Sequence, residues 1–467
     1  MSDAGARCSA YTDDALGRDD MVGLLERLAR REVSGAELRA AATARAHAVQ
    51  PQLNAVTSWV PEAPAGLATE GAALAGIPTV FKDNEPLAGY VTSHGSMAVA
   101  ETRATSSSPW VSHALGLGLA PFAKSALSEF GLTATTETVR FGATHNPWDL
   151  ERSPGGASGG SAALVAAGVV PLAHGNDGGG SIRIPASCCG LVGLKPTRGR
   201  LPDIVSRVPV DIAVQGVLTR TVRDTARYYA EAERLDPATD LPEIGLVEGP
   251  SAVRLRVGVV TAPPMGLPVS DEVVALVTAT AELLSSLGHE VVEISNPAYD
   301  AFGPDFLRYW GLLAGLARVL GSLEFGRGFD GSRVEPFTRE LASVAREQAP
   351  LLPGTVRRLR ELARDHEPVY SSCDVVLCPV LADEPVRLGH LGPDVEPRTH
   401  LLRVLRYVSF TPLQNVSGSP AISLPLGVSA SGLPLGVQLA APFGHERRLL
   451  ELAFELEAAS PWPTLAT

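Results

Sequence analysis

Cysteine is scarce in this sequence and shows no pattern typical of a disulfide framework or a metal site. The 467 residues include five cysteines, at positions 8, 188, 189, 373 and 378. An odd number without regular spacing indicates reduced thiols in the core, as in a cytoplasmic enzyme. The adjacent pair Cys188–Cys189 has no CxxC spacing and no nearby histidine partner, so we expect no metal site.

Basic clusters and long apolar runs are also missing. The net charge is -12 and no run of five basic residues occurs, which argues against nonspecific nucleic-acid binding. No apolar run reaches the roughly 18 residues of a membrane-spanning helix. The N-terminal stretch is polar and acidic, so we expect no secretion signal. We therefore expect a cytoplasmic protein without nucleic-acid or membrane partners, while the oligomeric state, a homodimer included, stays open.

The apolar residues alternate between helical and strand patterns along the whole chain. Asp20 and Ser34 can cap two N-terminal helices, and a strand follows, over residues 20–60. The segment from 255 to 295 reads as strand, capped helix and strand, which is a βαβ unit. This alternation predicts a layered α/β domain with a mixed sheet.

Residues 297–355 are the most irregular part of the chain. They contain several glycines and many aromatic residues, at positions 302, 306, 309, 310, 325, 329 and 337. We expect this segment to form a variable helical cap over a substrate region.

Two dense glycine patches lie close together, at 153–163 (SPGGASGGSAA) and 173–186 (AHGNDGGGSIRIPA). Glycine is chosen where the backbone takes unusual angles or approaches another group closely. A phosphate-binding P-loop needs GxxxxGK[ST], and neither patch has that lysine. The motif GGASGG does precede a plausible helix, but the pattern fits dinucleotide binding poorly.

The second patch fits acyl-transfer chemistry better. Three glycines precede Ser181, and their backbone N–H groups could converge on the oxyanion of a tetrahedral intermediate. No GxSxG elbow occurs, so an α/β-hydrolase site is not supported. His174 is the nearest histidine, and we expect it to be structural. Lys82 ends the apolar run IPTVF, so burial could make it a neutral base for a serine nucleophile.

Four segments together resemble the amidase signature family: GIPTVFKDN, the block from Ser153 to Thr197, CDVVLCPVL, and the C-terminal FTPLQNVSGSPAISLPLG with GLPLGVQL. The resemblance covers about residues 20–458. The central block is also similar to the branch that contains 6-aminohexanoate cyclic dimer hydrolase. The family fold implies one α/β domain over residues 1–467, with a mixed, mostly parallel sheet flanked by helices and a catalytic core at 72–200.

The resemblance also implies roles for individual residues. Ser181 falls on the nucleophile, Lys82 on the base, and the oxyanion donors on the backbone of Gly178, Gly179 and Gly180. Asp177 and Arg183 fall on positions that support this loop. The family chemistry needs no cofactor and no metal.

One position departs from the family pattern. The family has a bridging serine after a cis peptide bond, 24 residues before the nucleophile, and that position is Ala157 here. Three explanations stay open: an engineered substitution, a relay through Ser158 or water, or a natural relative with altered or lost hydrolysis.

The sequence thus predicts an amidase that forms a serine acyl-enzyme with a small amide substrate. An acyltransferase or amide-forming enzyme, an amidotransferase subunit and a non-hydrolytic binding protein are the alternatives. The aromatic cap favours an apolar or cyclic amide, and the candidates for the substrate pocket are Phe306, Tyr309, Trp310 and Gln414.

Overall fold

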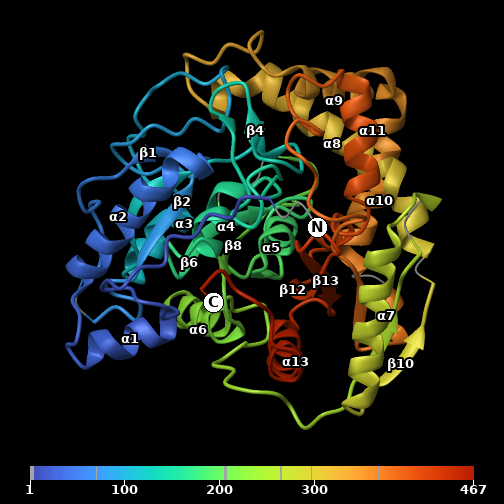
Figure 1. The fold of residues 1–467 in the computed structure, drawn as a ribbon. Coiled ribbons are helices and arrows are strands. Elements are labelled where there is room, and N and C mark those ends of the chain that lie inside the picture. Colours follow the sequence, from blue (N-terminus) through green and yellow to red (C-terminus); the bar gives the residue numbers. More distant parts are fainter. Residues whose placement is uncertain are drawn as a thin grey trace.

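We describe a computed structural model that covers residues 5–69, 71–203, 208–262, 266–295, 297–365 and 368–466. Its centre is an eight-stranded mixed sheet, shown with the surrounding helices in Figure 1. The strand order is β10 (Glu290–Glu293), β9 (Arg256–Val259), β11 (Val375–Pro379), β13 (Pro434–Ala440), β12 (Ala421–Val428), β7 (Val192–Lys195), β8 (Val214–Thr219) and β6 (Leu172–Asp177). The α/β class with a large mixed sheet is therefore confirmed.

The expectation of a mostly parallel sheet is wrong. Among the described strands, β9 pairs in parallel with β10 and β11, whereas the pairings from β11 through β13, β12, β7 and β8 to β6 are antiparallel. The only βαβ crossover foreseen in detail, β9–α7–β10 with α7 at Asp271–Ser286, is parallel as such a unit must be. The apolar runs elsewhere are equally buried in antiparallel strands, because helices cover both faces of this sheet.

A small second sheet lies against the edge strand β6. Its order is β1 (Val56–Trp59), β3 (Ala120–Ser125) and β2 (Pro78–Lys82). The helices α1 (Met21–Ala29) and α2 (Gly35–Leu53) precede it, and α3 (Pro109–Gly116) lies between β2 and β3. Asp20 and Ser34 cap α1 and α2 as predicted, and Ser34 forms a full capping box with Glu37. These caps fix the N-terminal layer beside the strand that carries Lys82.

Three helices follow the glycine patches and the sheet edge. The first patch leads into α4 (Gly159–Ala166), the second into α5 (Arg183–Cys189), and α6 (Val222–Leu235) follows β8. Two short strands, β4 (Glu137–Thr138) and β5 (Gly142–Ala143), form a separate hairpin. No disulfide joins any of the five cysteines, which all lie buried within the described residues. The described part of the chain contains no helix that could cross a membrane.

The irregular segment forms a helical group at the top right of Figure 1. It consists of α8 (Pro297–Glu324), α9 (Pro336–Glu347) and α10 (Leu352–Asp365), with α11 (Pro397–Tyr407) beside them. The chain then forms α12 (Leu413–Ser417) and closes with α13 (Glu446–Ala459). The group around α8 therefore packs over one end of the sheet, where it can contribute side chains to a site.

The first glycine patch serves close packing of backbone segments. A Cβ on Gly156 would lie 2.7 Å from the carbonyl carbon of Ala134, and one on Gly160 would lie 2.5 Å from the amide nitrogen of Ala126. Both neighbours are backbone atoms, which cannot move aside as a flexible side chain does. The patch thus holds α4 directly against the loop after β3.

We expect Gly160→Ala to lower the free energy of unfolding by about 1–3 kcal/mol, because the added methyl group overlaps the Ala126 backbone. Gly249→Ala is the matched control: its Cβ meets nothing within 4 Å, and we expect a change within about 0.5 kcal/mol. Urea unfolding of both variants measures the difference. Equal stability of the two variants would contradict this packing role.

Candidate active site

The second glycine patch forms a tight loop between β6 and α5. Strand β6 ends at Asp177, and α5 begins at Arg183, so Ser181 lies at the turn. Gly180 has φ +129°, and a Cβ there would lie 2.4 Å from Thr411 Oγ1. Ser181 is half-buried and lines a cavity of about 230 Å³. The loop therefore places Ser181 in the wall of this cavity.

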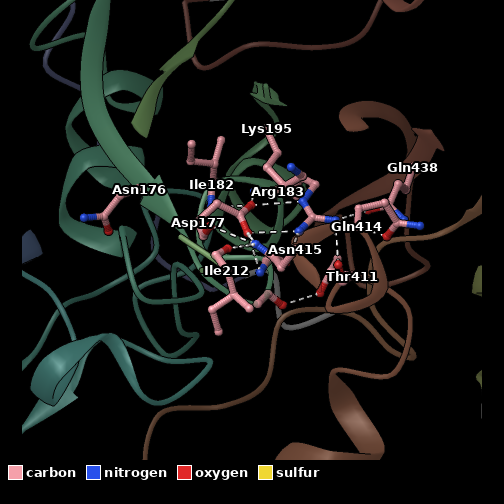
Figure 2. Close-up of polar contacts among 12 residues, drawn as sticks. Asn176, Asp177, Ile182, Arg183, Lys195, Ile212, Thr411, Gln414, Asn415 and Gln438 are labelled. Atoms are coloured by element: carbon pink, nitrogen blue, oxygen red, sulfur yellow. Dashed lines mark hydrogen bonds and ion pairs between the residues drawn. The ribbon is translucent and has the colours of Figure 1, made fainter. Parts of the chain in front are cut away.

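A buried ion pair closes this loop. Arg183 donates from Nε to Asp177 Oδ2 at 3.0 Å and from Nη2 to Oδ1 at 2.9 Å, and both side chains have zero exposure (Figure 2). Asp177 Oδ1 also accepts from the Gly180 backbone N–H at 2.7 Å, and Oδ2 accepts from Ile182 N–H at 3.1 Å. The Asp177 carboxylate, at the start of the loop, is thus hydrogen-bonded to residues 180–183 at its end.

The same pair joins the loop to the segment around α12. Arg183 Nη1 donates to the Thr411 carbonyl at 2.8 Å, and Arg183 Nη2 donates to Asn415 Oδ1 at 2.7 Å (Figure 2). Arg183 Nη1 also donates to Gln438 Oε1 at 2.6 Å. Burial alone would raise the pKa of Asp177, but the charge and hydrogen bonds of Arg183 hold it well below its usual range. Asp177 is therefore ionised and fully engaged, as a support for the loop rather than a proton carrier.

The backbone donors of the loop are not equivalent. The Gly180 N–H is already bonded to Asp177, so the expectation that it serves as an oxyanion donor is wrong. Within the described residues, no hydrogen bond engages the N–H groups of Gly178, Gly179 or Ser181. A Cβ on Gly178 would meet nothing nearer than 4.0 Å, and one on Gly179 would lie 3.6 Å from Phe306. Gly178 and Gly179 line the cavity, where their N–H groups are candidates to bind an oxyanion.

Lys82 lies at the end of β2 with 1% exposure. Its Nζ donates to Asn176 Oδ1 at 2.6 Å and lies 3.5 Å from the Asn176 carbonyl oxygen. Within the described residues, no carboxylate lies at ion-pair distance from it. Burial lowers the pKa of Lys82 to about 7, even though the charges of Asp177 and Glu85 raise it. Near neutral pH, a large fraction of this amine is therefore uncharged and able to accept a proton.

Lysine is rare in the whole chain. The sequence has 39 basic residues besides histidine, of which only three are lysines, at positions 82, 124 and 195, and all three are buried. Arginine cannot lose its proton in a protein, so it cannot replace a lysine that acts as a base. Lys124 is paired with Asp83 at 2.7 Å, and Lys195 donates to the Pro196 carbonyl. The scarcity of lysine is a signal in the sequence that narrows the candidate bases to three, and Lys82 is the one that contacts the strand leading to Ser181.

Strand β6 explains how Lys82 and Ser181 are held on connected elements. Side chains alternate along a strand, so His174 and Asn176 face Lys82 while Asp177 faces Arg183. In Figure 2, Asn176 accordingly lies apart from the cluster around Arg183. Asn176 was missed as a site residue, although this alternation across β6 could have revealed it.

His174 has a structural role. Its Nδ1 accepts from the Lys82 backbone N–H at 3.2 Å, so Nε2 carries the proton and donates to Gln215 Oε1 at 2.8 Å. Its ring packs on Trp110 with centroids 3.8 Å apart. Burial lowers the pKa of His174 to about 3, so the ring stays neutral. His174 holds the end of β2 and does not face Ser181 through either nitrogen.

The position of the family's bridging serine is occupied by a buried methyl group. The peptide bond between Gly156 and Ala157 is cis, and Ala157 has zero exposure. The adjacent Ser158 is also fully buried, and its Oγ donates to the Asn176 carbonyl at 3.5 Å. Ser158 and Lys82 therefore both lie 3.5 Å from the same carbonyl oxygen.

The cavity includes two of the four residues predicted for a substrate pocket. Phe306 and Trp310 line it. Tyr309 does not, because its hydroxyl bonds to the Val210 backbone on the buried side of α8. Gln414 does not either, because it is buried beside Arg183 and Gln438. Gly178, Gly179 and Ser181, predicted for the catalytic loop, line the cavity as well. The other lining residues were not predicted, and they come from the 130–134 loop, residue 156, Ile184, residues 212–213, Leu313 and residues 404–412.

The chain is similar to known amidases over almost its whole length. The Amidase family model matches residues 37–450. A protein of Mycobacterium leprae (strain TN), provisionally named amidase AmiC, is 45% identical over 463 residues, which cover 98% of each chain. The 6-aminohexanoate-cyclic-dimer hydrolase of Paenarthrobacter ureafaciens is 36% identical over 464 residues, which cover 92% of each chain.

Solved structures give the same assignment. The structure of 6-aminohexanoate cyclic dimer hydrolase complexed with substrate has a TM-score of 0.86 and 32% identity, over 96% of this chain and 98% of that chain. A bacterial aryl acylamidase of the amidase signature family shares the fold, with a TM-score of 0.78 and 24% identity over 95% of this chain and 97% of that chain. This chain belongs to the amidase signature family and is an amide hydrolase that acts on carbon–nitrogen bonds other than peptide bonds.

Proposed function

We propose that this protein hydrolyses a carboxamide through an acyl-enzyme on Ser181, with Lys82 as the base. The observation that carries the proposal is the buried Lys82 amine with a pKa of about 7, held by Asn176 on the strand that leads into the Ser181 loop. A base with a pKa near the working pH combines a high uncharged fraction with enough basicity to accept a proton.

The first chemical step transfers the acyl group to the enzyme. Ser181 Oγ forms a bond to the carbonyl carbon of the substrate while its proton passes to Lys82. The carbonyl oxygen becomes an oxyanion, and we assign its stabilisation to the N–H groups of Gly178 and Gly179, because both residues line the cavity. The carbon–nitrogen bond then breaks, and the proton held by Lys82 passes to the departing amine.

The second step regenerates the enzyme. Water attacks the acyl carbon and gives its proton to Lys82, and the acid leaves as Ser181 recovers the proton. The ion pair of Asp177 and Arg183 takes part in neither transfer, because both groups stay charged and fully hydrogen-bonded. Its role in this scheme is to keep the loop rigid, so that donors and nucleophile need no reorganisation during the reaction.

The route of the proton between Ser181 and Lys82 is the point at which this chain differs from the family pattern. Ala157 has no hydroxyl, so we propose Ser158, which shares the Asn176 carbonyl with Lys82, as the relay. The two distances of 3.5 Å are long for hydrogen bonds, so this relay would be less efficient than a directly bonded serine.

The nucleophile can be tested by covalent labelling. We expect a fluorophosphonate probe to modify Ser181, because its hydroxyl faces the cavity, and peptide mass spectrometry locates the adduct. Ser181→Ala should abolish labelling and amide hydrolysis. Ser431→Ala, on the surface, is the control and should label normally. An adduct that persists in Ser181→Ala would refute the assignment.

The pH profile tests Lys82 as the base. We expect kcat/KM to rise with pH and to level off above about pH 7, because only uncharged Lys82 accepts the proton. At pH 5 the rate should be about 100-fold below the plateau, two pH units below the pKa of the base. The measurement is initial-rate kinetics on an uncharged amide between pH 5 and 9.

Substitutions of Lys82, with Lys195 as the control position, complement the pH profile. Lys82→Met should reduce the plateau rate by about 10²–10⁴-fold, and Lys82→Arg should not restore it. Lys195→Met is the control, since burial lowers the pKa of Lys195 to about 7 as well, yet its amine bonds only to the Pro196 carbonyl among the described contacts. If the pH dependence disappears in Lys195→Met and persists in Lys82→Met, Lys195 is the base and the assignment to Lys82 is wrong.

The relay can be tested at positions 157 and 158. We expect Ala157→Ser to raise the acylation rate by about 10²–10⁴-fold, because a hydroxyl gives a shorter proton path, and to change stability by about 1 kcal/mol or less. Ser158→Ala in the natural background should lower the residual rate. Single-turnover acylation, followed by intact-protein mass spectrometry, separates this step from product release. An unchanged rate in Ala157→Ser, with complete loss in Ser158→Ala, would show that Ser158 alone is the relay.

A further inference from the structure

The cavity beside Ser181 is almost free of polar side chains. Among its described lining residues only Thr133 and Ser181 have a polar side chain, and none is charged. Thr133 Oγ1 is hydrogen-bonded to His400 Nε2 at 3.1 Å, so its hydroxyl is already engaged. His400 is buried and stacks on Phe337, and burial lowers its pKa to about 4, so it is neutral. No charged group of the described wall could pair with a charged substrate.

Helix α8 supplies one wall of the cavity. Phe306, Trp310 and Leu313 line it and recur at helical spacing, so they form one face of α8. The rings of Phe306 and Trp310 are nearly parallel, with centroids 6.3 Å apart and planes at 26°. Trp310 is backed by Phe337 of α9, with centroids 5.8 Å apart. This wall presents aromatic and aliphatic side chains, which suit a ring or a compact alkyl group.

Other apolar residues complete the enclosure. Phe130 lines the cavity from the loop after β3 and stacks on Phe325 at the end of α8, with centroids 5.0 Å apart. The side chains of Ile184 and Ile212, together with those of Val404, Leu405, Val408 and Pro412, line the cavity as well. The catalytic loop contributes Gly178, Gly179 and Ser181 to the same wall.

The cavity volume gives the size of the group that the apolar wall can surround. An apolar cavity of roughly 150 Å³ in a protein core holds benzene. The cavity here, of about 230 Å³, is half as large again and therefore holds about eight to ten non-hydrogen atoms. A group of that size is a six-membered ring with a short linker, or an unbranched chain of similar bulk.

We infer that this cavity binds the acyl group of the substrate, that the group is uncharged and apolar with about eight to ten non-hydrogen atoms, and that the α8 face formed by Phe306, Trp310 and Leu313 selects it. This inference rests on the proposed function, because it takes Ser181 as the nucleophile.

The acyl group, rather than the amine, belongs in this cavity. The departing nitrogen takes the proton held by Lys82 and leaves as a neutral amine after the first step, and water must replace it before the second step can begin. The acyl group stays attached to Ser181 through the second step, so a wall that surrounds Ser181 contacts it in both steps. An apolar acyl group also excludes water from the oxyanion donors, which strengthens their hydrogen bonds to the oxyanion.

The test compares matched p-nitrophenyl esters, which acylate serine with a good leaving group and so depend least on the relay at position 157. Cyclohexylacetyl and hexanoyl esters carry neutral groups, whereas 5-carboxypentanoyl and 6-aminohexanoyl esters carry a charge at the chain end. We expect kcat/KM to be at least about 100-fold higher for the neutral esters than for both charged ones. Comparable rates for neutral and charged esters would overturn the inference.

Variants of α8 give a second readout. Leu313→Arg introduces a cation that keeps its proton in the wall, so we expect it to raise the rate for the 5-carboxypentanoyl ester by about tenfold and to lower the rate for the hexanoyl ester. Val319→Arg is the matched control: Val319 is on the same helix but 76% exposed, and its ester preference should equal that of the natural protein. Trp310→Ala should shift the preference toward larger acyl groups. An unchanged preference in both cavity variants would contradict the role of α8.

Failure of the inference and failure of the proposed function give different results. Fluorophosphonate labelling of Ser181 depends on the nucleophile and not on the acyl preference. Labelling at Ser181 with no discrimination among the esters refutes the acyl-site inference alone. Absence of labelling refutes the nucleophile and with it both proposals. A preference that follows the amine of a set of amides, at constant acyl group, would place the amine in the cavity and also refute the inference.

Discussion

Removal of Lys82 from water is the constraint on which the account of this site depends. A buried ammonium group without a carboxylate beside it is unfavourable, and the amine responds by losing its proton more easily. The protein tolerates this because Asn176 accepts from Lys82 Nζ without neutralising its charge, at 2.6 Å. A carboxylate in place of that amide would make a stable ion pair, as Asp83 does for Lys124. The neutral acceptor leaves Lys82 without a counter-charge, and its contact with the strand that leads to Ser181 distinguishes it from Lys195, whose pKa burial also lowers to about 7.

Strand β6 places two opposite electrostatic arrangements on its two faces. On one face, Asn176 accepts a hydrogen bond from Lys82, whose pKa is lowered by burial. On the other face, Asp177 forms a permanent ion pair with Arg183, which satisfies the loop and keeps its charges fixed. The loop of Ser181 begins where these faces end. The ion pair of Asp177 and Arg183 therefore supports the loop with fixed charges, while Lys82, on the other face of the same strand, can gain and lose a proton.

Much of the fold and of the site could be predicted because their signals are local. The caps at Asp20 and Ser34, the βαβ unit and the glycine loop before Ser181 are set by neighbouring residues. Strand direction could not be predicted, because buried parallel and antiparallel strands have the same apolar composition. The engagement of Gly180 by Asp177, the inward turn of Tyr309 and the burial of Gln414 depend on partners distant in the sequence. Asn176 could have been predicted as a site residue only if the contact between β2 and β6 had been known.

The most direct test of the account is a measurement of the Lys82 ionisation itself. The chain has only three lysines, so lysine labelled with ¹³C at Cε gives three resonances, which Lys→Met substitutions assign. A pH titration by NMR of the natural protein then follows each amine separately. We predict that the Lys82 resonance titrates with a midpoint near pH 7 and that Asn176→Asp moves this midpoint upward. A Lys82 amine that stays charged above pH 9 in the natural protein would contradict the central claim.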